Sequence, residues 1–168
     1  GQARTPICKL PNVEHTEQSF PVLFLYRKEM IDSGGAGRWR GGLSAESCFV
    51  AHGTSEIVHD TLSSGNAIPT APGMMAGYPG AVNRYRFLRD SDVAQRFSAS
   101  QLPGDIAELV GQEETLQLRQ QNFIQRPWDV YAVLWSAAAG FGDPLERDPQ
   151  RVATDVVDEA ISAAAAVD

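Results

Sequence analysis

The chain has 168 residues, a length that fits one domain or part of a larger protein. Hydrophobic residues make up 43% and charged residues 21%, so the composition excludes a disordered chain. The net charge of −7 argues against nucleic acid or an anionic membrane as the main partner, because both bind a basic face.

The first half of the sequence alternates strand-like stretches with irregular ones. Residues 1–19 are polar, contain two prolines and predict an irregular surface segment. Asp32–Gly42 is a turn with five glycines, and Thr61–Asn83 predicts a long loop of the kind that is usually functional or packed against another surface. Three stretches have the apolar content or alternation of strands: Phe20–Met30, Leu43–His52 and Ser55–Asp60.

The second half predicts further strands and ends in a helix. Asp148 and Pro149 are typical of a helix start, and apolar residues recur at helical spacing from Val152 to Ala164. Short helical turns are expected at Asp92–Phe97 and Asp105–Gly111. Three strands are expected here: Tyr85–Leu88, Thr115–Leu118 and Trp128–Trp135. With 15 glycines and 10 prolines, the prediction is a mostly β (α+β) domain over residues 1–168, with long Gly/Pro loops, short helices and a C-terminal amphipathic helix.

The glycine-rich turn is a candidate anion site. It follows a predicted strand, its backbone N–H groups can be exposed, and Arg38 and Arg40 can meet a phosphate. However, it lacks the Gly-Lys-Ser/Thr ending of a P-loop, and no helix pattern follows it. The alternative is a hairpin-like connection whose arginines pair with nearby acidic residues.

The histidines and cysteines are candidate metal ligands or catalytic groups. Cys48 and His52 share one strand face but lie about 13 Å apart at ~3.3 Å per residue, too far to share one tetrahedral metal. Surface histidines and a buried free thiol are the favoured interpretation for the whole set, which comprises Cys8, His15, Cys48, His52 and His59. Two cysteines form no disulfide framework, so the cytoplasm is the expected compartment. No apolar run reaches the ~18 residues of a membrane span.

Two further segments carry unusual composition. The loop Pro69–Asn83 places Met74, Met75 and Tyr78 on a glycine-rich backbone, which suits a small-molecule pocket, an interface or a cover over the core. Gly140–Pro149 reads GFGDPLERDP and, taken locally, is a strand-to-helix connection.

Together these motifs resemble a known family. Asp32–Leu43, DSGGAGRWRGGL, and Gly140–Pro149 are similar to the paired signatures near the C-terminus of the hydantoinase B/oxoprolinase family. Thr5-Pro6 with the Phe20–Met30 stretch resembles the segment before the first signature, and Gly77–Gly80 with Asn83–Tyr85 resembles its glycine-rich middle. The sequence departs from the family at Ala137–Ala139 and at Ser44, where members often carry glycines.

The resemblance implies an ATP-dependent enzyme with several subunits. The family includes N-methylhydantoin, 5-oxoproline and caprolactam hydrolases and the large subunits of acetone and acetophenone carboxylases. Its members are several times longer, and their metal-binding histidine and aspartate motifs lie outside the matching part. The chain is therefore expected to be the C-terminal region of such a protein, present as a short separate chain.

The expected function is a small subunit of a multi-subunit ATP-dependent ketone carboxylase, structural or completing the carboxylation site. The alternatives are a subunit of an ATP-dependent cyclic-amide hydrolase and a purely structural assembly subunit. The expected partners are a hydantoinase A-type ATP-binding subunit and a truncated hydantoinase B-type subunit, which would hold ATP, Mg and a divalent metal, and the substrates are a ketone and bicarbonate. No cofactor is expected on this chain, whose candidate substrate or anion contacts are Arg38, Arg40, Gly140, Gly142 and Asp143.

Overall fold

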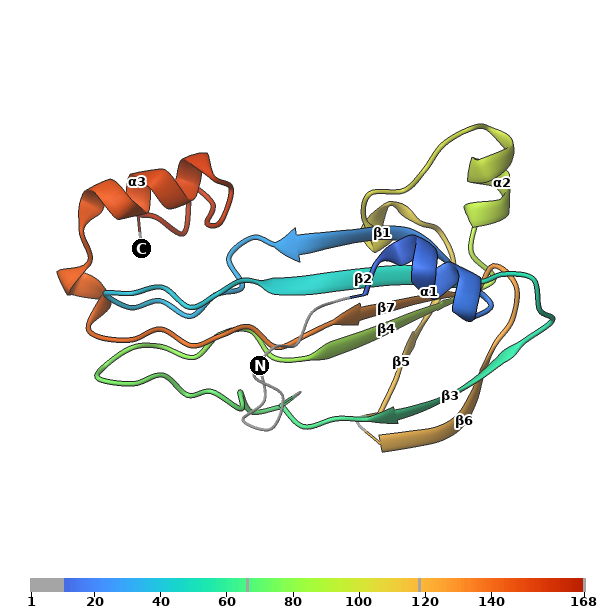
Figure 1. The fold of residues 1–168 in the computed structure, drawn as a ribbon, viewed down its shortest axis with the longest axis horizontal. Coiled ribbons are helices and arrows are strands. Elements are labelled where there is room, and N and C mark those ends of the chain that lie inside the picture. The colour runs from blue at the N-terminus through green and yellow to red at the C-terminus, as the bar shows by residue number, and fades with distance from the viewer. Residues whose placement is uncertain (1–10, 66, 118, 168) are drawn as a thin grey trace.

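A computed structural model describes residues 11–65, 67–117 and 119–167 of the chain. The structure is mostly β, with short helices, as predicted (Figure 1). In chain order its elements are α1 (Val13–Ser19), β1 (Val22–Met30), β2 (Ser44–Ala51), β3 (Ile57–Leu62), β4 (Arg84–Arg89), α2 (Val93–Ser98), η1 (Ile106–Glu108), β5 (Gln112–Thr115), β6 (Arg119–Gln125), β7 (Val130–Leu134), η2 (Pro144–Glu146) and α3 (Pro149–Val157).

Five strands form an antiparallel sheet in the order β1-β2-β7-β4-β5. The middle strand, β7, is apolar on both sides because both faces of this sheet are covered. Val130 and Ala132 join the core on one face, and Tyr131 and Val133 join the core on the other, as the sequence alternation predicts. Cys48 of β2 is fully buried in the first of these cores.

Different parts of the chain cover the two faces. Val93 of α2 and Ile106 of η1 pack with Leu109 on the first face. The second face is covered by a separate two-stranded sheet of β3 and β6, which lies below the main sheet in Figure 1. Between these two sheets Phe123 contacts the rings of Phe87 and Tyr131 edge-on. The strands thus form a rigid body from whose end the connecting loops project.

Two sequence predictions are wrong near the ends of the sheets. Part of the segment expected to be irregular forms the helix α1, because the side chain of Asn12 caps it by accepting a hydrogen bond from the Glu14 amide at 2.8 Å. The strand expected at Thr115–Leu118 is misplaced: β5 spans Gln112–Thr115, Leu116 and Gln117 lie outside any strand, and Leu118 lies outside the described residues. The sequence of β6, RQQNFIQ, is polar because this strand buries only Phe123 and Gln125.

The C-terminal helix is shorter than the helical spacing of apolar residues predicts. Helix α3 has Asp148 as its N-cap and Pro149 in its first turn, as expected, but it ends at Val157. Glu159 then adopts a φ of 56°, which a continuing helix does not allow. Within the described residues, no helix is long and apolar enough to cross a membrane.

Candidate functional site

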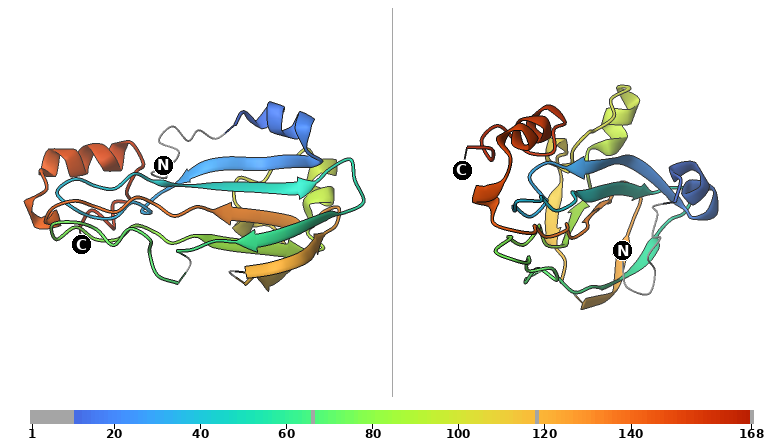
Figure 2. Two further views of the ribbon diagram at one scale, coloured as in Figure 1. Left: turned by 60° about the horizontal axis from the view of Figure 1, so that its bottom comes forward. Right: turned by 60° about the vertical axis from the view of Figure 1, so that its left-hand side comes forward.

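Three extended segments lie side by side beyond the ends of the strands (Figures 1 and 2). They comprise residues 33–42, 73–81 and 137–142, and we call them the glycine arm. Backbone hydrogen bonds connect all three: the Gly35 amide donates to the Ala138 carbonyl at 2.9 Å, the Tyr78 amide to Ala36 at 2.8 Å, and the Gly140 amide to Tyr78 at 2.9 Å. The two family-like signatures and the glycine-rich middle therefore form one structure.

The spacing between these backbones explains the glycines. A Cβ atom added to Gly35 would lie 2.3 Å from the Tyr78 carbonyl oxygen, and one added to Gly140 would lie 2.0 Å from that of Ala36. Both distances are far below van der Waals contact, so the segments approach this closely only because side chains are absent. Glycine here permits backbone-to-backbone packing.

The amide groups of the arm are largely engaged within it. Gly35 and Gly41 donate to backbone carbonyls, and so do Gly140 and Gly142, whose acceptors are Tyr78 and Met74. The anion contact expected at Gly140 and Gly142 stays a prediction. Because their amide N–H groups already donate to backbone carbonyls, an anion there would have to bind other groups. Of the two arginines of the arm, Arg38 is more than half exposed and can meet an anion, whereas Arg40 is largely buried.

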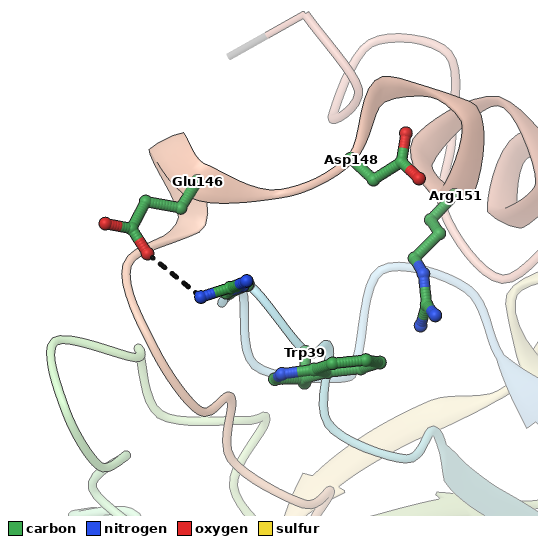
Figure 3. Close-up of a pocket in the computed structure, with 5 residues that line it drawn as sticks. Trp39, Glu146, Asp148 and Arg151 are labelled. Atoms are coloured by element: carbon green, nitrogen blue, oxygen red, sulfur yellow. Dashed lines mark ion pairs between the residues drawn. The ribbon is translucent and has the colours of Figure 1, made fainter.

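A shallow pocket of about 240 Å³ lies where the arm meets η2 and α3 (Figure 3). Arg38 and Glu146 face each other across it, with 3.5 Å between Nη1 and Oε2, and both side chains are more than half exposed. The guanidinium carbon of Arg151 lies 4.2 Å from the centre of the Trp39 ring, a cation–π distance. With Asp148 at its rim, the pocket has two cationic and two anionic side chains.

Arg38→Gln should leave stability almost unchanged. An ion pair this exposed contributes less than about 1 kcal/mol to the free energy of unfolding. If Arg38 binds an anion in the assembled enzyme, the variant should bind inorganic phosphate about tenfold more weakly in calorimetric titration, which corresponds to ~1.4 kcal/mol. A large fall in unfolding temperature with unchanged phosphate affinity would instead assign Arg38 a structural role.

The other arginines hold α3 against the arm. Arg40 donates to Asp155, with Nε 3.1 Å from Oδ2, and Arg147 donates to the same carboxylate. All three side chains are largely buried, with exposed fractions of 13–21%. Asp143 accepts a hydrogen bond from the Leu145 amide at 2.9 Å and so caps η2.

The structure brings the five predicted contact residues to one end of the molecule, in the arm and at the start of η2. It also places there four side chains that the sequence reasoning did not single out as contacts: Trp39, Arg147, Arg151 and Asp155. Local spacing does not indicate the pairing of Trp39 with Arg151 or of Asp155 with Arg40, because each pair joins distant parts of the chain. Arg147 lies eight residues before Asp155, and that spacing alone does not identify a contact.

The three histidines and Cys48 lie outside this site. Among the described residues, no three His, Cys, Asp or Glu side chains gather in a way that could hold a metal ion. Cys8 lies outside the described residues. Burial raises the pKa of the Cys48 thiol to about 12, which keeps this thiol protonated and unreactive near neutral pH.

His59 packs between the two sheets. Its ring stacks on Phe123 with centroids 4.9 Å apart, and its Nε2 lies 2.7 Å from Oε1 of the fully buried Gln125. Because the amide oxygen only accepts, Nε2 carries the proton and donates. Burial lowers the pKa of His59 below its ordinary value of 6.5.

This pKa predicts a pH-dependent stability. Below about pH 6.5, His59 binds a proton more readily in the unfolded chain than in the folded one, because folding lowers its pKa. The contribution of neutral, buried His59 to the free energy of unfolding is therefore complete above that pH and is lost as the pH falls. The unfolding temperature, followed by circular dichroism, should fall between about pH 7 and 5, and fall less in His59→Gln. His52→Gln, at an exposed position, should behave like the parent chain. Equal slopes in all three proteins would contradict the prediction.

Comparison with known proteins agrees with this architecture. The sequence matches the Hydantoinase B/oxoprolinase family over residues 2–144, a range that includes all three segments of the glycine arm. A β-rich body with an arm of packed glycine segments is thus the form that this sequence family takes here. The chain belongs to the hydantoinase B/oxoprolinase family.

Two relatives are carboxylase subunits. The chain is 26% identical to the acetophenone carboxylase delta subunit of Aromatoleum aromaticum, over 89% of this chain and 23% of that protein. It is 28% identical to the acetone carboxylase alpha subunit of Xanthobacter autotrophicus, over 86% of this chain and 20% of that protein. The chain thus spans less than a quarter of the length of either relative.

Solved structures share the fold. A nucleotide-free acetone carboxylase superposes with a TM-score of 0.78 at 24% identity, covering 94% of this chain and 22% of that one. The ATP-dependent caprolactamase of Pseudomonas jessenii superposes with a TM-score of 0.68 at 23% identity, covering 90% of this chain and 23% of that one.

Proposed function

We propose that this chain is a subunit of an ATP-dependent ketone carboxylase of the acetone or acetophenone type. The main support is the similarity to subunits of both enzymes over 86–89% of the chain. The same fold in a caprolactamase supports a second candidate, a cyclic-amide hydrolase. We prefer the carboxylase because both curated relatives above are carboxylase subunits.

Within this enzyme the chain would complete the assembly or its site rather than catalyse alone. Its buried thiol is protonated, and the His59 ring is packed between the sheets. Arg40 and Arg147 are committed to Asp155. These polar groups stabilise the fold, and Arg38 in the shallow pocket is the side chain best placed to meet an anionic reactant.

The remaining machinery would come from partner subunits in the cytoplasm. A hydantoinase A-type subunit would bind ATP with Mg and phosphorylate the carbonyl oxygen of the ketone or its enol. A truncated hydantoinase B-type subunit would hold the divalent metal and, completed by this chain, carboxylate the activated ketone with bicarbonate. The phosphoryl group would hold the ketone in its enol form. As the new C–C bond to the bicarbonate carbon forms, one bicarbonate oxygen would leave with the phosphoryl group as inorganic phosphate.

The test uses the assembly purified through a tag on this chain. Mass spectrometry should identify an A-type and a B-type chain, and ATP hydrolysis should depend on a ketone together with bicarbonate. Labelled bicarbonate should enter a β-keto acid. Hydrolysis of ATP that depends on a lactam or hydantoin, with no incorporation of bicarbonate, would establish the second candidate instead.

A further inference from the structure

We propose that the apolar face of the glycine arm is a docking surface for a hydantoinase B-type polypeptide, the part of the family's length that this chain does not contain. This inference rests on the proposed function and specifies one contact within it. We define the apolar face by five side chains: Trp39, Met74, Met75, Tyr78 and Phe141.

These side chains come from all three segments of the arm, and three of them are neighbours across paired backbones. Phe141 is bridged to Trp39 on one side and to Met74 on the other, and the Tyr78 amide is bonded to the neighbouring segment. The exposed fractions of the five side chains range from 47% to 73%, so the arm carries five large apolar side chains that are open to solvent. Clusters of this kind mark interaction sites, whereas isolated exposed apolar residues are ordinary.

The exposure follows from the way the arm is built. A Cβ on Gly77 would lie 2.2 Å from the Gly140 carbonyl oxygen, and one on Gly37 would lie 2.7 Å from the Phe141 nitrogen. The interior of the arm is therefore filled by backbone and leaves no space for a large side chain. The apolar side chains must point outward, and only another surface can bury them.

The scarcity of charged residues in the segment that carries Met74, Met75 and Tyr78 indicates a partner whose contact surface is apolar. Residues 61–83 contain no Asp, Glu, Lys or Arg, although charged residues make up 21% of the whole chain. Protein interfaces are depleted of charge at their centre and enriched in Met and aromatic residues, which is the composition of this face. The charged pocket adjoins this face at one edge, where the Arg151 guanidinium lies 4.2 Å from the centre of the Trp39 ring. Arg40 and Arg147 pair with Asp155 of α3.

The length of the relatives indicates what covers the face. Both curated relatives carry this region within a protein of which it is only 20–23%. The arm projects beyond the sheets, away from the core of this chain (Figures 1 and 2). An apolar surface that the chain cannot cover by itself is therefore matched by the remaining three-quarters or more of a hydantoinase B-type protein.

The first experiment places a photo-reactive cross-linker in the native assembly. Tyr78→p-benzoylphenylalanine should cross-link to a hydantoinase B-type chain, identified by mass spectrometry. The control, Leu102→p-benzoylphenylalanine, is at an apolar position that is 75% exposed, against 59% for Tyr78, in the connection between α2 and η1. It should not form that cross-link. Cross-linking of Tyr78 to a second copy of this chain, or to no hydantoinase B-type chain, would overturn the proposal.

The second experiment measures affinity. Met74→Gln with Tyr78→Gln should weaken association with the B-type chain by at least about tenfold, whereas Leu102→Gln with Val110→Gln should not change it. Equal unfolding temperatures for both double variants would show that the loss of affinity does not come from misfolding. If the arm variant has a lower unfolding temperature, the photo-cross-linking result at Tyr78 tests the docking proposal instead. Unchanged affinity in the arm variant overturns the docking proposal and leaves the ketone assay untouched. If the arm variant loses affinity but the parent assembly hydrolyses ATP with a lactam and not with a ketone, the docking proposal stands and only the carboxylase function is overturned.

Discussion

Gly41→Ala should lower the unfolding temperature of the chain strongly, on the order of 10 °C for a protein of this size. The added Cβ would lie 2.0 Å from the Ala138 carbonyl oxygen and 2.5 Å from its carbon. Both are backbone atoms, so no side-chain rotation relieves the overlap and two segments of the glycine arm must separate. Overpacking of this kind costs about 3 kcal/mol or more in the free energy of unfolding. Thermal unfolding followed by circular dichroism measures it.

The neighbouring residue supplies a matched control. A Cβ on Gly42 would meet only the Ala138 Cβ at 3.9 Å, which is ordinary contact. Gly42→Ala should therefore be neutral, or stabilise by up to about 1 kcal/mol through the smaller entropy of the unfolded chain. Equal losses of stability in the two variants would show that glycine flexibility, and not close packing, explains the motif.

This contrast shows where the sequence was informative about the fold. Local alternation was enough for β7, because Val130 and Tyr131 belong to opposite cores and both faces needed apolar residues. It was not enough for β6, whose outer side chains are polar and whose pairing partner, β3, lies some sixty residues earlier. A strand that buries only Phe123 and Gln125 has no alternation strong enough to detect.

The candidate site was predictable to the same extent. The glycine pattern of residues 32–42 correctly indicated close backbone approach, but a local pattern does not identify the approaching group. The structure shows other backbone at Gly35 and Gly41, where an anion was also a reasonable expectation. The pairing of Arg40 with Asp155 spans 115 positions, so only the folded chain reveals it.

Asp155→Asn should release α3 from the glycine arm. The carboxylate accepts hydrogen bonds from both Arg40 and Arg147, and all three side chains are largely buried. A neutral amide would leave two guanidinium groups close together without their counter-charge, which costs about 2–3 kcal/mol for a pair removed this far from water. The unfolding temperature should fall, and trypsin should cut after Arg151 sooner than in the parent chain.

Asp158→Asn is the control on the same helix. Asp158 is exposed at the C-terminal end of α3, where a negative charge opposes the helix dipole. Its removal should change the free energy of unfolding by less than about 0.5 kcal/mol and leave trypsin cleavage unaltered. If Asp155→Asn behaves like this control, Asp155 does not hold α3, and the hydrogen bonds of Asp32 with Ala160 and Ser162 remain to hold the C-terminal segment.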